Sequence, residues 1–192
     1  MKKRSLTRFV IEMEYLRIPK KRIGVLIGKE GATKREIEDR LQVKIELDAE
    51  EGTVRVENIG EDVLAEWKTR DIIKAIGEGM NPQKAMKLRS DDYVLEIIEL
   101  EDIVGRSKKT LERQKARIIG TKGKARRAVE EYTGADVSVS RRCVAVVGTP
   151  ERADAAREAI TLICRGMPHG VVYKLLQKKS RELKEKDFSL WK

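Results

Sequence analysis

The sequence is poor in aromatic residues, histidine and cysteine. Phe, Trp and Tyr make up 4% of its 192 residues, which argues against a surface on which many nucleic-acid bases stack. With a single histidine, His169, and no Cys-x-x-Cys pair, we expect no metal site and no cofactor. Cys143 falls in an apolar strand and Cys164 on an apolar helix face, so we expect both to be buried free thiols.

Long apolar runs are also missing. No stretch approaches the roughly 20 apolar residues that span a bilayer. The start Met1-Lys2-Lys3-Arg4 leads into an alternating pattern rather than the apolar core of a signal peptide. We therefore expect a cytoplasmic protein that has no contact with a membrane.

Motifs of common enzyme classes are absent as well. The sequence has no Gly-x-x-x-x-Gly-Lys-Ser/Thr, no Gly-x-Gly-x-x-Gly and no evident Ser/His/Asp or Cys/His set. Its carboxylates mostly alternate with Lys and Arg, which is typical of solvated surface pairs. We therefore prefer a non-catalytic binding protein, and a metal-dependent ribonuclease is the least favoured alternative.

What the sequence contains is one unit that occurs twice. The tetrapeptide Gly28-Lys29-Glu30-Gly31 recurs as Gly120-Thr121-Lys122-Gly123, each time after an isoleucine. One such tetrapeptide arises about once by chance in a chain of this length. The evidence for a repeat therefore depends on the residues around it. Further pairs keep the same spacing of 92 residues: Arg35 and Arg127, Ile37 and Val129, Glu38 and Glu130. This spacing indicates a duplicated supersecondary unit.

Each half reads as strand, helix, Gly loop, helix, strand, strand and helix. In the first half we expect strands over residues 9–15, 43–47 and 53–56, and helices that carry Ile23 to Ile27, over 33–41 and over 62–76. In the second half we expect strands over 93–98, 136–140 and 143–147, and helices over 111–119, 124–132 and 149–165. In the helix of 62–76, the candidate buried residues are Leu64, Trp67, Ile72 and Ile76.

Two domains follow from this repeat. We expect a first domain over residues 1–90 and a second over residues 91–192, with the boundary near residues 90–92. Each last helix is followed by a similar turn, Gly79-Met80-Asn81-Pro82 and Gly166-Met167-Pro168-His169. A short helical extension is expected after each turn.

The positive charge gathers around the two Gly loops. The formal net charge is +10, yet residues 105–127 hold ten basic residues against one acid, and residues 17–35 hold seven against one. The remaining residues are slightly acidic. This is the charge distribution expected of a polyanion-binding protein.

We predict that the loops and their basic flanks bind nucleic acid. Two glycines let the backbone approach a phosphodiester closely, and the next helix offers its N-terminal amides. The contact residues expected in the first half are Lys20, Lys21, Arg22, Gly28, Lys29, Glu30, Gly31, Lys34 and Arg35, of which Glu30 opposes the lysines. Those expected in the second half are Arg113, Lys115, Arg117, Gly120, Thr121, Lys122, Gly123, Lys124, Arg126 and Arg127.

Together these features resemble the type I KH domain over nearly the full chain, and residues 133–139 (Thr-Gly-Ala-Asp-Val-Ser-Val) match the strand after the family's second helix. The resemblance implies an α+β fold of two type I KH domains, each a three-stranded antiparallel sheet packed against three helices. It also implies single-stranded RNA in an aliphatic groove beside each loop. The candidate groove residues are Ile23, Leu26, Ile27, Ile37 and Ile45, and Ile118, Ile119, Val129 and Val137, and for each of them the protein core is the competing assignment.

The sequence departs from the KH pattern in two places. Lys34 and Arg126 stand where the family usually has an aliphatic residue, which favours phosphate contacts over a groove floor. The connection over residues 101–110, between the strand and the first helix of the second unit, is unusually long and basic.

The tandem arrangement and the Gly-Met turns resemble the archaeal relatives of the eukaryotic small-subunit assembly factor called partner of Nob. This resemblance implies binding to the 3′ region of small-subunit ribosomal RNA during maturation, beside the Nob endonuclease and translation initiation factor two. Two alternatives stay open. One is a general KH regulator of RNA, and the other is a protein adaptor in which one KH unit alone binds RNA, with Trp191 and the acidic residues 46–51 facing proteins.

Overall fold

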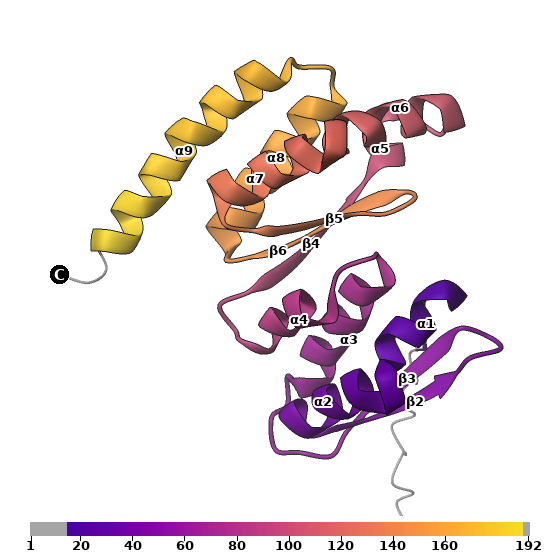
Figure 1. Ribbon diagram of the computed structural model, residues 1–192. Coiled ribbons are helices and arrows are strands. Elements are labelled where there is room, and N and C mark those ends of the chain that lie inside the picture. The colour runs from indigo at the N-terminus through magenta and orange to yellow at the C-terminus, as the bar shows by residue number, and fades with distance from the viewer. Residues whose placement is uncertain (1–14, 190–192) are drawn as a thin grey trace, which may run out of the picture.

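The computed structural model describes the backbone of residues 15–189 and the side chains of residues 15–185 (Figure 1). The first unit consists of β1 (Leu16–Arg17), α1 (Lys20–Ile27), α2 (Ala32–Leu41), β2 (Val43–Asp48), β3 (Thr53–Asn58), α3 (Ala65–Gly77), α4 (Pro82–Ala85) and the 3-10 turn η2 (Met86–Arg89). The second consists of β4 (Val94–Glu99), α5 (Leu100–Val104), α6 (Lys108–Ile119), α7 (Lys124–Thr133), β5 (Asp136–Val139), β6 (Cys143–Gly148), α8 (Pro150–Cys164) and α9 (His169–Ser189).

The element order predicted from the repeat is confirmed in both units. Each unit has a three-stranded antiparallel sheet, in the order β1-β3-β2 and β4-β6-β5. The predicted α+β class is therefore confirmed. Of the strand predicted over residues 9–15, only Tyr15 is among the described residues, and it is not in a strand; β1 lies just beyond this range, at Leu16–Arg17. The predicted connection over 101–110 contains the short helix α5 and the start of α6.

The first sheet has one buried face. Val43 and Ile45 on β2 are buried beneath the helices, and so are Val54 and Val56 on β3. The alternate residues are polar, as in Lys44, which pairs with Glu46 at 2.9 Å. This alternation is typical of an antiparallel sheet with one solvated face.

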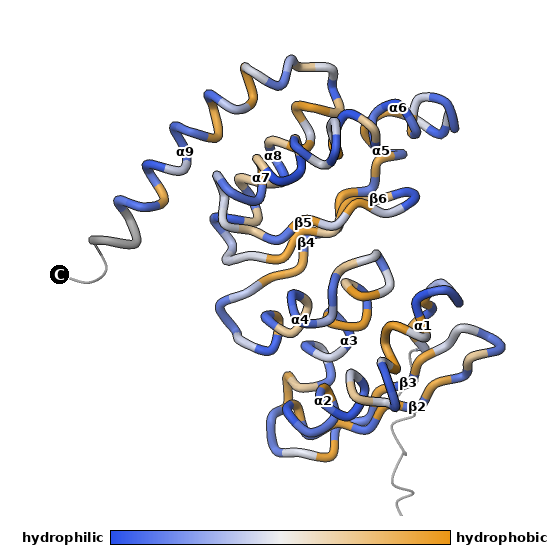
Figure 2. Tube along the Cα trace, in the orientation of Figure 1, coloured by the Kyte–Doolittle hydropathy of each residue, from blue (hydrophilic) through white to orange (hydrophobic). Residues whose placement is uncertain are grey.

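The central strand of the second sheet, β6, is buried on both faces. In β6, Val144 and Val146 pack in the core of the second unit, whereas Ala145 and Val147 pack in the core of the first. The first unit's α3, α4 and η2 lie against the face of this sheet that α7 and α8 do not cover (Figure 1). Figure 2 shows the apolar strands β4, β5 and β6 between the two layers of helices. The two units therefore share a packed interface.

Polar contacts line the same interface. Ser138 Oγ donates a hydrogen bond to the Glu78 carbonyl oxygen at 3.1 Å, and Cys143 Sγ donates to a carboxylate oxygen of Glu78 at 3.0 Å. Lys84 pairs with Asp136 at 2.8 Å, and Lys87 pairs with the same carboxylate at 2.6 Å. These contacts fix the two units relative to each other.

Asp136 should make the stability of this interface depend on acid. Burial alone would raise the pKa of its carboxyl, but hydrogen bonds from Lys84 and Lys87 outweigh burial and hold the pKa below its ordinary value. A carboxyl whose pKa is lower in the folded protein than in the unfolded chain stabilises the fold at any pH above its unfolded pKa of about 3.9. This stabilisation is lost as the pH falls through the pKa of the folded protein. We expect the free energy of unfolding to fall as the pH drops from about 5 to below 3.

Urea unfolding of Asp136→Asn over this pH range tests the assignment. The variant should be less stable at neutral pH and should lose less stability in acid. Asp71→Asn is the control, because burial raises the pKa of the Asp71 carboxyl and its removal should not flatten the acid loss. An unchanged acid profile in Asp136→Asn would contradict the prediction.

Both cysteines are buried free thiols, as predicted. Burial, with a contribution from the Glu78 carboxylate, raises the pKa of Cys143 to about 12, and burial raises the pKa of Cys164 to about 11. Because the thiolate is the reactive form, we expect iodoacetamide at pH 8 to label neither thiol of the folded protein at an appreciable rate. Mass spectrometry should find rapid double labelling after addition of denaturant. Fast labelling without denaturant would contradict the burial of the two thiols.

One part of the predicted core is wrong. Ile72 and Ile76 are buried, but Leu64 is 53% exposed and Trp67 is 67% exposed. Helix α3 begins at Ala65 and turns Ala65, Ile72 and Ile76 towards the sheet. Trp67 lies two residues from Ala65, so the helical period of 3.6 turns it away from that face.

The division into domains at residues 90 and 91 remains a proposal, because the core of the first unit also includes Ala145 and Val147 of β6.

Candidate nucleic-acid interface

The two Gly loops have nearly the same backbone conformation. In the first, Gly28 and Gly31 have φ of 74° and 80°, and Glu30 between them has φ of 54°. In the second, Gly120 and Gly123 have φ of 70° and 76°, and Lys122 has φ of 52°. Three of the four residues in each loop thus have left-handed backbone angles, which glycine adopts without strain.

The first glycine of each loop has no room for a side chain. A Cβ on Gly28 would lie 2.8 Å from the backbone nitrogen of Thr33, and a Cβ on Gly120 would lie 2.8 Å from that of Ala125. The loop backbone therefore lies directly against the start of the next helix. The N-terminal amides of α2 and α7 are thereby brought beside the loops, where a phosphate group could approach them.

An arginine fastens each loop to the helix that follows. Arg35 Nη2 donates a hydrogen bond to the carbonyl oxygen of Glu30, and Arg127 Nη2 donates to that of Lys122 at 2.9 Å. Both arginines were predicted to bind nucleic acid. Their contacts show that they also hold the left-handed residue of the loop in place.

Lys34 and Arg126, which depart from the KH pattern, face carboxylates of their own helices. Lys34 lies 3.6 Å from Glu38, and Arg126 lies 3.8 Å from Glu130. Glu38 also accepts a hydrogen bond from the backbone of Ile45 at 2.8 Å, and Glu130 accepts one from the backbone of Val137 at 3.1 Å. This pair of glutamates joins the second helix of each unit to the next strand.

Arg22 and Arg117 stabilise the turns that follow the long helices. Arg22 donates to the carbonyl oxygens of Ile76 and Met80, both at 2.8 Å. Arg117 donates to that of Met167 at 2.7 Å. The repeated Gly-Met turns are therefore docking points for an arginine of the first helix. The prediction that these two arginines bind nucleic acid is untested, and the structure shows a different role for their guanidinium groups.

Other predicted basic residues point into solvent. Lys20, Lys21 and Lys29 are exposed in the first unit. Arg113, Lys122 and Lys124 are exposed in the second, and Lys115 is half-buried. Among residues 15–185, no carboxylate forms an ion pair with these four residues of the second unit. The second loop thus lies in a region of positive charge that the fold does not neutralise.

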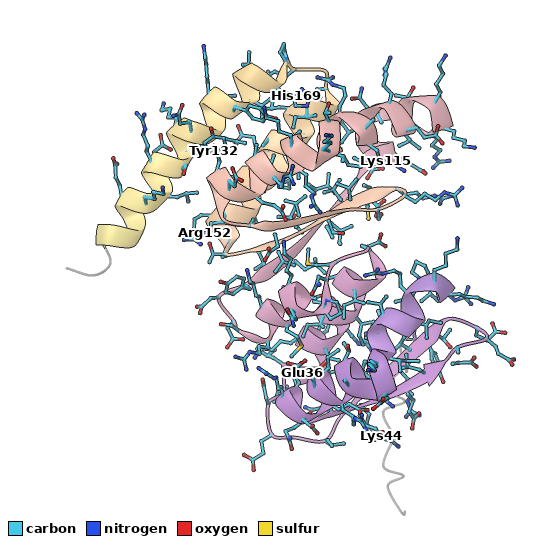
Figure 3. All side chains as sticks on the ribbon, viewed as in Figure 1. Glu36, Lys44, Lys115, Tyr132, Arg152 and His169 are labelled. Carbon is cyan, nitrogen blue, oxygen red and sulfur yellow. The ribbon has the colours of Figure 1, made fainter. Side chains whose placement is uncertain are left out.

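An open groove of about 550 Å³ adjoins the second loop. Its lining comes from α6, the loop, α7 and the start of α9: Arg113, Ala116, Arg117, Gly120, Thr121, Lys124, Ala125, His169 and Tyr173. The ring centre of Tyr173 lies 6.0 Å from that of His169 and 6.4 Å from that of Tyr132. Figure 3 labels His169 at the start of α9 and Lys115 on α6, at the same end of the second unit.

His169 and Tyr173 line this surface although neither was predicted to bind nucleic acid. His169 belongs to the repeated Gly-Met turn, where its Nε2 lies 2.9 Å from the carbonyl oxygen of Arg117. That hydrogen bond explains why the turn comes next to the second loop. The signal was present in the repeat, but the repeat does not show which helix the turn contacts.

Most of the predicted aliphatic groove is core instead. Seven candidates are at most 5% exposed: Ile23, Leu26, Ile37, Ile45, Ile118, Val129 and Val137. Ile27 is half-buried, and Ile119 is 37% exposed. The buried seven lie on the inner helix faces and sheet faces, where packing within the unit uses their surface. An aliphatic floor for bases is therefore limited to the helix ends beside the loops.

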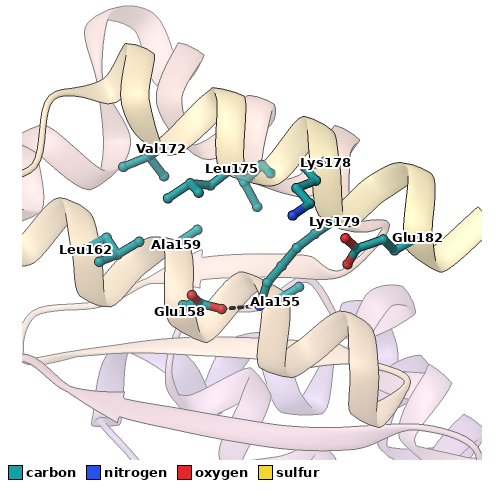
Figure 4. Close-up of a pocket in the computed structure, with 10 residues that line it drawn as sticks. Ala155, Glu158, Ala159, Leu162, Val172, Leu175, Lys178, Lys179 and Glu182 are labelled. Carbon is teal, nitrogen blue, oxygen red and sulfur yellow. Dashed lines mark hydrogen bonds and ion pairs between the residues drawn. The ribbon is translucent and has the colours of Figure 1, made fainter.

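A smaller apolar pocket of about 170 Å³ lies between α8 and α9. Figure 4 shows Leu162, Val172 and Leu175 around it, with the ion pair of Lys179 and Glu158 across its edge. Leu175 is 43% exposed. The pocket is a gap in the packing of two helices, and its lining also includes the charged residues Glu158, Lys178, Lys179 and Glu182.

Neither a metal centre nor a membrane span is found in the described part of the chain. No group of three His, Cys, Asp or Glu side chains there is arranged to hold a metal ion. None of the helices over residues 15–189 is long and apolar enough to cross a membrane.

Comparison with known families matches each half of the chain to a KH domain. The KH domain matches residues 13–88, and the eukaryotic-type KH domain, of KH type I, matches residues 94–181. A KH domain-containing protein of Methanocaldococcus jannaschii is 48% identical over 182 residues, which are 94% of this chain and 79% of that protein.

More distant relatives include the pre-rRNA-processing protein PNO1 of Candida albicans. It is 30% identical over 148 residues, which are 77% of this chain. The chain spans 54% of the length of that relative.

Solved structures of archaeal proteins are similar over most of the chain. A protein of unknown function from Aeropyrum pernix has a TM-score of 0.86 at 36% identity, and the match covers 93% of this chain and 96% of that one. A chain in the a/eIF2alpha-aDim2p-rRNA complex from Pyrococcus horikoshii has a TM-score of 0.83 at 46% identity. That match covers 88% of this chain and 94% of the other.

Proposed function

Because the chain belongs to the KH-domain family, with one KH domain in each half, we propose that it binds single-stranded RNA through its Gly-x-x-Gly loops. We further propose that this RNA is the 3′ region of small-subunit ribosomal RNA and that the protein is a non-catalytic factor of its maturation. The observation that carries the proposal is the second loop, where left-handed glycines meet a helix N-terminus within unneutralised positive charge. KH domains clamp about four nucleotides in this way.

The second unit is proposed as the main RNA site. Lys122 and Lys124 would contact phosphate oxygens, while Arg127 holds the loop backbone. In the first unit, Lys29 is opposed by Glu30 within the loop itself. We therefore expect the first loop to add less to the affinity than the second.

The ribosomal target is proposed from the relatives. PNO1 is named as a pre-rRNA-processing protein, and the aDim2p structure is a complex with rRNA and a/eIF2alpha. We propose that this chain likewise works beside translation initiation factor two and the Nob endonuclease, in the cytoplasm. The general-regulator and adaptor alternatives predict other RNAs or RNA contacts in one unit alone.

Crosslinking in cells of the source organism tests the target. We expect RNA reads at the 3′ end of small-subunit ribosomal RNA, on peptides that contain Gly28 or Gly120. Reads spread over messenger or transfer RNAs would point to a general regulator instead. Cleavage of the RNA by the purified protein with a divalent metal, lost on replacement of Asp or Glu but kept in loop variants, would refute a non-catalytic role.

Binding should weaken steeply with salt. When the protein neutralises a phosphate, counterions are released from the RNA. For a single strand, the logarithm of the association constant therefore falls with the logarithm of the salt concentration with a slope of about −0.7 for each phosphate contacted. Four or five contacts give a slope near −3, or roughly a 60-fold loss of affinity between 50 and 200 mM salt. Fluorescence anisotropy with a labelled RNA oligonucleotide measures it. Lys124→Gln should make the slope shallower by about 0.7, and a salt-independent affinity would contradict the phosphate contacts.

A further inference from the structure

An exposed apolar patch lies on the first unit, away from both Gly loops. It comprises Ile59, Val63, Leu64 and Trp67, which are 65%, 81%, 53% and 67% exposed. We call these four residues the Trp67 patch. Val63 and Leu64 lie in the turn just before α3, and Trp67 in its first turn follows them by four and three residues, so the three side chains lie on the side turned away from the sheet. Clustered exposed apolar residues mark interaction sites more often than chance placement does.

The KH fold does not require these residues to be apolar. The Gly-Met turns after the long helices align α3 with α8 at a spacing of 87 residues, as Gly79 aligns with Gly166. At that spacing Leu64 corresponds to Glu151 and Trp67 to Asp154, and both acids are exposed on α8. The same helix face is therefore polar in one unit and apolar in the other, and the patch is a property of the first unit alone.

The surroundings of the patch are acidic, in a protein with a net charge of +10. Residues 57–71 contain five acids and two basic residues. Both basic residues are engaged within the unit, because Lys68 contacts Asp62 at 3.0 Å and Asp91 at 2.9 Å, and Arg70 contacts Glu66 at 3.0 Å. An apolar centre with an acidic rim is complementary to an apolar surface with a basic rim.

The patch is separated from the RNA-binding loop of its own unit. The loop precedes the N-terminus of α2, whereas the patch lies near its C-terminus, where the Ile59 backbone donates to the Gln42 carbonyl oxygen at 3.1 Å. A helix of ten residues is about 15 Å long. A partner on the patch and RNA on the loop could therefore be bound together.

We propose that the Trp67 patch docks a protein partner through an apolar helix flanked by lysines and arginines. Trp67 is the anchor, because a large, exposed indole among aliphatic neighbours is typical of residues that carry most of the energy of an interface. Repulsion by the acidic rim makes RNA an unsuitable occupant. The proposal does not depend on the RNA that the loops bind.

Tryptophan fluorescence tests the site directly. The chain has two tryptophans, so Trp191→Phe leaves Trp67 as the sole reporter. A helical peptide of leucine and lysine should shift the Trp67 emission to the blue in a saturable way, and a matched peptide of leucine and glutamate should not. Leu64→Glu, which copies the second unit, should weaken peptide binding at least tenfold and leave RNA affinity unchanged. Equal binding of both peptides, or an unaffected Leu64→Glu, would overturn the proposal.

Two further measurements test the proposal, one on the free protein and one in cells. An emission already shifted to the blue in the free Trp191→Phe protein would mean that the chain's own residues cover Trp67, and it would overturn the proposal. A photoreactive amino acid at position 67 should crosslink in cells to a basic, apolar peptide of another protein. Crosslinks to RNA, or to a second copy of this chain, would refute it.

Discussion

Replacing Thr121 and Lys122 together by aspartate should lower the affinity for single-stranded RNA at least about 100-fold, or about 2.7 kcal/mol. The change places two carboxylates in the second loop, where a phosphate would lie against backbone amides. It also removes the lysine that is exposed at the loop tip. Electrophoretic mobility shift or anisotropy with a single-stranded RNA measures the loss.

The fold should tolerate this double replacement. Both side chains are exposed, and the left-handed backbone at Lys122, with φ of 52°, is one that aspartate adopts more readily than most residues. The Arg127 hydrogen bond goes to the backbone of Lys122 and does not need the lysine side chain. We expect the thermal unfolding midpoint to change by a few degrees at most.

Lys29→Asp with Glu30→Asp in the first loop is the matched control. It alters the corresponding positions, at which Glu30 already carries a negative charge, so we expect a loss of affinity of about fivefold or less. Equal losses of affinity in the two variants would mean that both loops contribute equally to RNA binding. A loss confined to the first-loop variant would refute the second unit as the main RNA site.

The repeat made the arrangement within each unit predictable. Gly28 and Gly120 identify the turn between two helices because no other residue fits there, with left-handed angles and no space for a Cβ. Alternation in β2 and β3 predicts a sheet with one buried face, and this is what the structure has. Such local patterns depend on a few neighbouring residues, which a single sequence displays in full.

The packing between the two units is less evident in the sequence than the fold within each unit. Strand β6 is apolar at every position from Cys143 to Val147, whereas β3 alternates. A continuous run indicates a strand buried on both faces, but it does not show what covers the second face. In the same way, apolar groove residues and core residues have the same composition, so sequence alone could not decide that Leu26 and Ile118 are core.

Polar contacts between residues far apart in the chain could not be predicted from the sequence. Arg22 and Arg117 stand in basic segments, and the prediction that they bind nucleic acid is untested. In the structure their guanidinium groups donate to carbonyl oxygens 58 and 50 residues away. Nothing in a local charge pattern distinguishes an arginine that faces a phosphate from one that caps a distant turn. Trp67 is the opposite case, because an aromatic residue in an amphipathic helix was expected to be buried and is exposed.

Ala145→Asp should separate the two units. Ala145 is fully buried in the core of the first unit although it belongs to a strand of the second, so a carboxylate there would lie unpaired between them. We expect a loss of about 3 to 5 kcal/mol in the free energy of unfolding. Calorimetry should then resolve two transitions where the wild type has one, since the units would no longer unfold together.

Ile97→Asp is the control on the same sheet face. Ile97 lies directly opposite Ala145 in the antiparallel pair of β4 and β6, but it is 36% exposed, so its carboxylate can reach water. We expect a much smaller loss and a single transition. Equal effects of the two variants would mean that the added charge, and not its position between the units, causes the change.

Ala145→Asp also tests whether the shared interface serves RNA binding. A fixed arrangement presents both loops to one RNA strand without the entropy cost of ordering a linker, which raises the effective concentration of the second contact. If both loops grip one strand, Ala145→Asp should weaken binding of a long RNA while leaving that of a short RNA, which reaches one loop only, unchanged. Equal binding of long and short RNA by the wild type would instead mean that the interface stabilises the fold and leaves each loop to act alone.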